Sequence, residues 1–254
     1  MPAASPRLSI IILTWNQRDY TLRCLQSISS LVNDEAVEVL LVDNASTDGT
    51  REAVARDFPS VKVIVNSENR GVAAARNQGL KQATGRKLML LDNDTIASAD
   101  AITAMEHYLD THPAVGLCGC RLVGEDGTVQ ASYKEYPGLG IKVRNVLGMK
   151  RKETTFPIDD EGNLTPTYVI GACQMFPRKV LERVGLLDEH IFYGPEDADY
   201  CLRIAAAGWQ VKYLTQPTIV HCFQRSTTRR IFSPLGRKHI AALLYFYRKH
   251  RRLW

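Results

Sequence analysis

Short apolar runs alternate with helical patterns along the first part of the chain. Buried strands are predicted where about four or more apolar residues run together between polar segments. Helices are predicted where apolar residues recur every three or four positions, or where Ser, Thr and Asp can cap a first turn. The predicted strands cover residues 8–14, 37–43, 61–66 and 87–92, and the predicted helices cover 18–31, 46–58 and 71–85, with another helix beginning after Ser98.

This alternation predicts an α/β fold with a mainly parallel central sheet that is covered by helices on both faces. Ligands of such sheets bind beyond the carboxyl ends of the strands. Polar residues end all of the predicted strands, namely Thr14, Asp43, Asn66 and Asp92. Because the ends of parallel strands meet at one edge of a sheet, candidate ligand contacts gather along a single rim.

The pattern changes in the second half of the chain. Residues 124–166 are rich in Gly, Pro and charge and have little periodicity, so we expect loops that cover a site and help to select an acceptor. Strand character returns at 167–177. A helix is predicted over 195–208, because Pro195 suits a first turn and Gly208 suits the position after a last turn.

The composition is that of a soluble globular protein. The chain has 254 residues, of which 45% are hydrophobic and 23% are charged, so a sizeable core is expected. The six cysteines show no zinc-binding spacing, and reduced thiols are expected. The apolar run in MPAASPRLSIIIL is too short for a signal peptide or a membrane span. We therefore expect a protein that is cytoplasmic or bound peripherally to the inner face of the cell membrane.

The net charge of +5 is unevenly distributed. Residues 225–254 hold nine of the 32 Lys and Arg and no Asp or Glu, so the rest of the chain carries about −4. This distribution argues against nucleic acid as a partner. Within residues 233–254, apolar side chains recur at helical spacing from Ile240 to Tyr247. This basic amphipathic helix either packs on the domain or adsorbs to an anionic membrane, where each base contributes about 1 kcal/mol.

Two carboxylates one residue apart follow the strand at 87–92. Asp92, Asn93 and Asp94 form either a polar turn that closes the strand or a site for a divalent cation. Mg²⁺ and Mn²⁺ prefer carboxylate oxygens and often share their ligands with phosphate groups. Such an ion would stabilise the negative charge that develops on a departing diphosphate.

Two further charged residues lie beside helix starts. Asp43 either helps to cap the next helix or accepts a hydrogen bond from the imide N–H of a pyrimidine base. Arg76, in the predicted helix over 71–85, is either a surface arginine or a contact to a nucleotide. The residue types alone leave both alternatives open.

Several segments, taken together, resemble the family 2 glycosyltransferases, and in particular a branch that includes bacterial rhamnosyltransferases. The segments are IIILTWN, LLVDNASTDGT, NRGVAAARNQGL, LMLLDNDT, FYGPEDADYCLRIAAAGW and IVHCFQRST, and they follow the family's order over most of the chain. The resemblance implies a GT-A fold, a nucleoside diphosphate sugar donor, Mg²⁺ or Mn²⁺, and inversion at the sugar. It also implies a catalytic domain over 1–232, with a nucleotide-binding half at about 8–123 and an acceptor half at 124–232, followed by the helix at 233–254.

The resemblance assigns roles to residues by their positions in these segments. Asp197 corresponds to the catalytic base, with Glu196 beside it. Asp92 and Asp94 correspond to the metal motif, which His221 often completes. Contacts to the nucleotide sugar are implied for Thr14, Trp15, Asn16, Asp43, Asn69, Gly71, Arg76, Asp92, Asn93 and Arg225.

The predicted reaction requires these residue types. A sugar hydroxyl becomes a good nucleophile when a carboxylate takes its proton as the new bond forms. The anomeric carbon gains oxocarbenium character as the diphosphate leaves, as in glycoside hydrolysis. Simpler interpretations exist, because Glu196 and Asp197 also suit the first turn of a helix, and His221 also suits a structural hydrogen bond.

Two alternative functions compete with glycosyl transfer to a glycan or lipid-linked acceptor in cell-surface polysaccharide assembly. A sugar-1-phosphate nucleotidyltransferase needs a Gly-rich, basic loop after the first strand, where this chain has TWNQRDY. A non-catalytic nucleotide-sugar-binding protein would lack the metal motif or the base, whereas candidates for both are present. The donor is predicted to be a dTDP- or UDP-linked sugar, with dTDP-rhamnose suggested by the resemblance alone.

Overall fold

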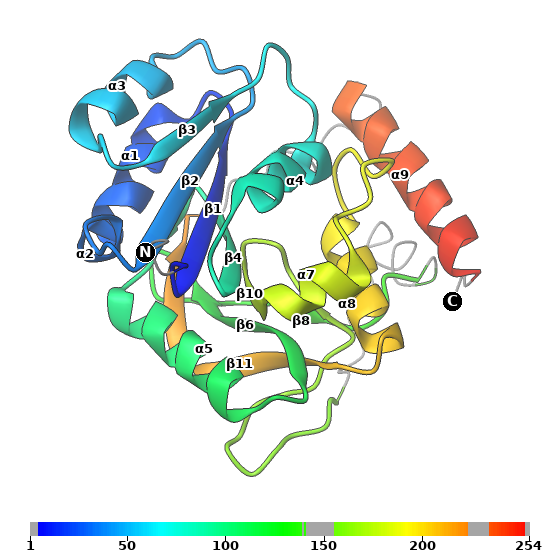
Figure 1. Cartoon of the computed structure of the whole chain (residues 1–254). Coiled ribbons are helices and arrows are strands. Elements are labelled where there is room, and N and C mark those ends of the chain that lie inside the picture. Colours follow the sequence, from blue (N-terminus) through cyan, green and yellow to red (C-terminus); the bar gives the residue numbers. More distant parts are fainter. Residues whose placement is uncertain (1–4, 139, 141–154, 223–233, 252–254) are drawn as a thin grey trace.

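The computed structural model describes residues 5–138, 140, 155–222 and 234–251 (Figure 1). Within them, a nine-stranded sheet has the order β3-β2-β1-β4-β10-β6-β11-β5, with β7 also paired to β6. A two-stranded sheet, β8-β9, lies beside it. The expected α/β architecture with a central sheet is therefore confirmed.

The first half of the large sheet is parallel, as the sequence predicts. Its strands are β1 (Leu8–Thr14), β2 (Val37–Asp43), β3 (Lys62–Val65) and β4 (Lys87–Asp92). Thr14 pairs with Asp43, and Leu13 pairs with Asp92, so the carboxyl ends of β1, β2 and β4 lie level. The polar rim expected from the sequence is present.

The second half of the sheet is mixed. Strand β10 (Cys173–Pro177) runs antiparallel to both β4 and β6 (Val115–Val123), so β6 has the direction of β4. Strand β11 (Gln210–His221) then pairs with β6 in parallel. The short strands are β5 (Thr95–Ile96), β7 (Val129–Gln130), β8 (Tyr133–Lys134) and β9 (Tyr168–Val169). This arrangement brings the end of β11 next to β5, directly after the Asp92–Asp94 turn.

Helices cover both faces of the sheet, because consecutive residues of the central strands are apolar and point to opposite faces. Ile10 and Ile12 of β1 face one core cluster, whereas Ile11 faces the other. The first cluster contains residues of α1 (Arg18–Ser27), α2 (Ser29–Val32), α3 (Thr50–Asp57) and α5 (Ala99–Thr111). The second contains residues of α4 (Val72–Gln82), α7 (Arg178–Val184), α8 (Glu196–Ala206) and α9 (Pro234–His250).

Two elements differ from the prediction. The helix expected over 18–31 is divided at Ile28, where Ser27 bonds through its hydroxyl to the carbonyl of Cys24 and the N–H of Ala97. The strand expected over 167–177 is divided into β9 and β10. Its interruption at Gly171 has a clear cause, because the backbone N–H and the carbonyl of Gly171 both form hydrogen bonds with side chains of the site described below.

The C-terminal helix packs on the domain. Phe246 and Tyr247 of α9 are buried, and the hydroxyl of Tyr247 donates to the carbonyl of Pro137 at 2.7 Å. Lys249 forms ion pairs with Asp188 and with the fully buried Asp199 of α8. Figure 1 shows α9 alongside α8 and the segment after α7. Among the described helices, none has both the length and the apolar character needed to cross a membrane.

Candidate active site

At the end of β2, Asp43 is buried under an arginine. One carboxylate oxygen of Asp43 accepts the N–H of Ser46 at 2.9 Å. The other lies 3.2 Å from Nε of Arg51, whose side chain is 44% exposed, whereas that of Asp43 is fully buried. The second oxygen has no hydrogen-bond partner of good geometry among the described residues. A ligand that displaced Arg51 would therefore find an acceptor ready for one N–H group.

The residues after β1 divide into inward and outward side chains. The hydroxyl groups of Thr14 and Thr21 lie 2.8 Å apart, and the amide of Asn93 donates to both of them. Thr14 and Asn93 are buried, so these side chains connect β1 to the Asp92–Asp94 turn and do not face outward. Trp15, in contrast, is 51% exposed at this edge.

Two loops beside Asp43 are tied down by asparagines. Asn16 has a φ of 51° and accepts the backbone N–H of Thr47 at 2.8 Å. Asn69 accepts the backbone N–H of Gly71 at 3.0 Å. Gly71 has a φ of 82°, and a Cβ there would lie 2.6 Å from Phe192, so only glycine fits this junction. Gly71 thus joins the start of α4 to the chain that leads into α8.

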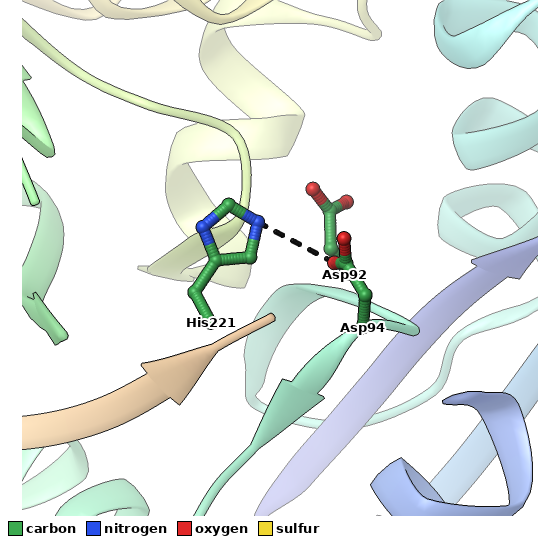
Figure 2. A group of neighbouring side chains, drawn as sticks. All are labelled: Asp92, Asp94 and His221. Carbon is green, nitrogen blue, oxygen red and sulfur yellow. Dashed lines mark ion pairs between the residues drawn. The ribbon is translucent and has the colours of Figure 1, made fainter. Parts of the chain in front are cut away.

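Asp92, Asp94 and His221 converge between the ends of β4 and β11 (Figure 2). One oxygen or nitrogen atom from each side chain lies within 4.8 Å of the others. Nε2 of His221 is 3.4 Å from a carboxylate oxygen of Asp94. Burial by itself lowers the pKa of His221, but the hydrogen bond and charge of Asp94 outweigh burial and raise this pKa. Two carboxylates and one imidazole form a donor set that suits Mn²⁺.

Arg76 connects this cluster to the start of α8. Its side chain is only 4% exposed, although the sequence left open a surface position. It donates to Asp92 at 2.5 Å and to the carbonyl of Gly171 at 2.8 Å. Its other terminal nitrogen lies 3.8 Å from a carboxylate oxygen of Glu196. Arg76 therefore fixes the position of Asp92 and offsets part of the negative charge of Glu196.

Glu196 and Asp197 form the first turn of α8. Asp197 is half-buried and accepts the N–H of Gly171 at 3.2 Å and that of Ala198 at 2.7 Å. Glu196 is 7% exposed, and one of its oxygens has no hydrogen-bond partner among the described residues. Burial raises the pKa of Glu196 to about 7, the charge of Asp197 adds to the rise, and Arg76 opposes it.

Gly171 is a site residue that the sequence did not single out. Its N–H donates to Asp197, and its carbonyl accepts from Arg76, which also contacts Asp92, so this one residue connects the α8 acids to the metal cluster. A Cβ at Gly171 would lie 2.6 Å from the guanidinium of Arg76. A glycine inside an apolar run was the available signal, because such a glycine often marks close approach of another group.

The structure therefore brings the predicted metal-binding and catalytic residues to one place. The Asp92–Asp94–His221 cluster and the Glu196–Asp197 pair are linked through Arg76 and Gly171. Asp43 lies further along the same rim, at the end of β2. Arg225, which the sequence also assigned to the nucleotide sugar, lies outside the described residues.

Comparison with known sequences gives a family match. The family model described as Glycosyl transferase family 2 matches residues 9–185. An N-acetylglucosaminyl-diphospho-decaprenol L-rhamnosyltransferase of Mycobacterium tuberculosis is 27% identical over 97% of this chain and 86% of its own length. The dTDP-rhamnosyl transferase RfbF of Shigella flexneri is 25% identical over 83% of this chain and 67% of its own length.

Comparison with solved structures supports the fold. A mannosyltransferase from Pyrobaculum calidifontis, in complex with GDP-mannose and Mn²⁺, has a TM-score of 0.63 and 24% identity, and the match covers 89% of this chain and 59% of that one. GalNAc-T7 with UDP, GalNAc and Mn²⁺ has a TM-score of 0.66 and 15% identity, covering 97% of this chain and 50% of that one. The GT-A fold expected from the sequence is confirmed.

Proposed function

The chain belongs to glycosyl transferase family 2, and we propose that it transfers a sugar with inversion from a dTDP- or UDP-linked donor to a hydroxyl of a lipid-linked glycan. The observation that carries this proposal is the link between the two acidic groups. Arg76 contacts Asp92 of the Asp92–Asp94–His221 cluster and lies beside Glu196 of the α8 pair. Such an arrangement suits a reaction in which a leaving diphosphate and an attacking hydroxyl need different carboxylates.

On the donor side, the proposal assigns the base to Asp43 and the diphosphate to the end of β4. The Asp43 oxygen that lies beside Arg51, without a hydrogen bond among the described residues, suits the imide N–H that thymine and uracil share. Asp92, Asp94 and His221 would hold Mn²⁺, with Mg²⁺ as the alternative, and the ion would stabilise the charge on the departing diphosphate. The exposed ring of Trp15 provides an apolar surface beside the nucleotide.

On the acceptor side, the proposal gives Asp197 the role of general base. Asp197 is held at the start of α8 by two backbone N–H groups, so its carboxylate has a fixed direction. It would take the proton of the acceptor hydroxyl as that oxygen attacks the anomeric carbon from the face opposite the diphosphate. Glu196 contributes a second acid, and its raised pKa makes its charge sensitive to what binds nearby.

The relatives guide the choice of donor and pathway. Two of them are named as rhamnosyltransferases, one for dTDP-rhamnose and one for a diphospho-decaprenol-linked acceptor. A putative teichuronic acid glycosyltransferase of Bacillus subtilis is 32% identical over 48% of this chain. We therefore propose dTDP-rhamnose as the first donor to test and cell-surface polysaccharide assembly as the process.

The outer face of α9 supports contact with an anionic membrane. Ile240 and Leu244 are 42% and 66% exposed on the side of α9 that does not contact the domain. Arg237 and Arg248 are exposed around them. We propose a cytoplasmic enzyme that is peripheral at the inner face of the membrane, near a lipid-linked acceptor. Replacing Ile240 and Leu244 by Glu should abolish sedimentation with anionic vesicles, whereas Glu at the equally exposed Ile158 should not.

The deciding experiment is a transfer assay with purified protein, a panel of nucleotide sugars, Mn²⁺ or Mg²⁺, and polyprenyl-diphosphate-linked acceptors. Asp197→Asn should lower transfer by about 10²–10⁴-fold while nucleotide binding persists. Asp94→Asn should instead weaken metal-dependent nucleotide binding. Asp100→Asn is the matched control, because Asp100 is exposed in the first turn of α5. Full transfer by the Asp197→Asn variant would remove the assigned base.

A further inference from the structure

The side chain of Gln130 in β7 forms two hydrogen bonds with His221. Its side-chain Nε2 donates to the backbone carbonyl of His221 at 2.8 Å. Its side-chain Oε1 lies 2.8 Å from Nδ1 of the same residue. Strands β7 and β11 both pair with the end of β6, so the Gln130 side chain reaches across that strand end. Nothing in the sequence singled out Gln130.

The two contacts fix the orientation of the amide and the state of the ring. A backbone carbonyl only accepts, so the group of Gln130 that faces it must be the NH₂. The opposite orientation would place two acceptor oxygens against each other. The amide oxygen therefore faces Nδ1 of His221, and because this oxygen only accepts, Nδ1 must carry the hydrogen.

Fixing the hydrogen on Nδ1 determines what the other nitrogen can do. In the neutral ring, Nε2 then holds the lone pair. Nε2 is the atom that points toward the carboxylate of Asp94, at 3.4 Å (Figure 2). We propose that Gln130 is a positioning residue that holds His221 in the Nδ1–H form, with the Nε2 lone pair directed into the Asp92–Asp94–His221 cluster as a ligand for Mn²⁺.

The inference rests on the metal site of the proposed function and adds a residue to it. Metal-ligating histidines usually donate their second ring N–H to a fixed acceptor, which sets the tautomer and the ring direction. Loss of such a partner typically weakens metal binding by about 10–100-fold. The bond to the His221 carbonyl alone would suffice to join β7 to β11. The bond to Nδ1 is the one that matters for the ring.

The test measures Mn²⁺ binding by electron paramagnetic resonance, with the nucleoside diphosphate present, in the wild type and in variants of Gln130. Gln130→Met should weaken Mn²⁺ binding by about 10–100-fold and reduce the nitrogen coupling that a bound imidazole gives in pulsed spectra. Gln130→Glu loses the donor to the His221 carbonyl but keeps an acceptor for Nδ1–H, so it should retain the nitrogen coupling. This conservative variant also keeps the test valid if Gln130→Met fails to fold.

A matched control and a double variant separate positioning from general stability. Gln78 also makes two bonds to one residue, Asn66, away from the cluster, so Gln78→Met should leave Mn²⁺ binding unchanged. In a His221→Ala background, Gln130→Met should have no further effect on Mn²⁺ binding. An equal loss in that background would show that Gln130 does not act through His221.

The outcomes also distinguish this inference from the proposed function. Sugar transfer by the wild type, together with unchanged Mn²⁺ binding and nitrogen coupling in Gln130→Met, overturns the role of Gln130 and leaves the proposed function standing. Absence of Mn²⁺ binding in the wild type overturns the metal site and with it the role of Gln130.

Discussion

Two Asp–Arg pairs lie on the same rim of the sheet, but burial is reversed between them. In the Asp43–Arg51 pair the acid is fully buried and the arginine side chain is 44% exposed. In the Asp92–Arg76 pair the arginine is 4% exposed and the acid is 35% exposed. Both acids end parallel strands that flank β1, so their positions in the sheet are equivalent. The helices that carry the arginines differ: Arg51 lies in α3, which follows β2, and is exposed, whereas Arg76 lies in α4, which precedes β4, and is buried.

The reversal indicates two different uses of an ion pair. A buried arginine cannot leave its partner without a large desolvation cost, so Arg76 is an anchor that turns Asp92 outward. A half-exposed arginine can exchange its partner for water at little cost, so Arg51 is a removable cover over Asp43. A ligand can therefore bind to Asp92 while Arg76 stays in place, whereas it must displace Arg51 before it can bind to Asp43.

The largest effect is expected when the anchor is removed. Arg76→Met leaves Asp92 and Glu196 without their shared cation, and breaking a buried pair in this way costs about 3–5 kcal/mol. The free energy of unfolding from urea denaturation should fall by this amount at neutral pH. A loss below about 1 kcal/mol would show that Arg76 is no more than a surface pair.

Glu196→Gln tests the second acid that the anchor compensates. The pKa of Glu196 is about 7 in the folded protein against an ordinary 4.5, so the folded state binds the proton more tightly than the unfolded state. Stability is therefore lost as pH rises from about 4.5 to 7, and the penalty, about 3 kcal/mol, is fully present above pH 7.

The Gln variant removes that ionisation. It should be more stable than the wild type at pH 8, and the difference should shrink toward zero near pH 4. Urea denaturation at a series of pH values measures this difference directly. A pH-independent difference would show that Glu196 does not titrate in this range.

The sequence predicted the acids at the strand ends better than the long-range contacts that join other residues to them. Parallel strands carry their own signal, because continuous apolar runs followed by Asp43 or Asp92 mark both the strand and its end. The convergence of His221 with Asp94 depends on β11 passing β6 to reach β5, a long-range pairing without a local signal. Here the resemblance to a family, and not the periodicity, placed His221 beside the two acids.

Other features could not be predicted because they arise from packing. The burial of Arg76 depends on Gly171, which lies 95 positions away and leaves room for the guanidinium. The packing of α9 was one of two open alternatives, since its basic and apolar positions suit a protein surface or a membrane equally. The contacts of Lys249 with Asp188 and Asp199 show that α9 packs on the domain. The membrane contact proposed above concerns the opposite face of the same helix.

A third buried acid extends the comparison with an intermediate case. Asp199 is fully buried and has three basic partners, Arg203, Lys249 and His250, with side chains 17–26% exposed. Because two partners remain, Lys249→Met should cost about 1–2 kcal/mol, less than the loss of Arg76. Hydrogen exchange should also become faster in α8 and in the residues around Asp188. A loss as large as that of Arg76→Met would show that α9 alone compensates Asp199.

Arg51→Met removes the guanidinium that covers Asp43, as Arg76→Met removes the one beside Asp92, and it should have the smallest effect on stability. Water can replace the half-exposed guanidinium, so the loss should stay below about 1 kcal/mol. Nucleotide binding should change in the opposite direction, because the competitor for the free oxygen of Asp43 is gone. Calorimetry should show dTDP or UDP binding about threefold to tenfold more tightly, which corresponds to roughly 1 kcal/mol.

The matched control for this last change lies on the same helix. Arg56 of α3 pairs with its neighbour Asp57 and with no other acid in the described part of the chain, and it is 71% exposed, so Arg56→Met should leave nucleotide affinity unchanged. Adding Asp43→Asn to Arg51→Met should cancel the gain, because the acceptor for the imide N–H is then weakened. Weaker nucleotide binding in Arg51→Met itself would mean that Arg51 contacts the nucleotide directly. Arg51 would then resemble Arg76 in function despite its exposure, and exposure alone would not distinguish a cover from an anchor.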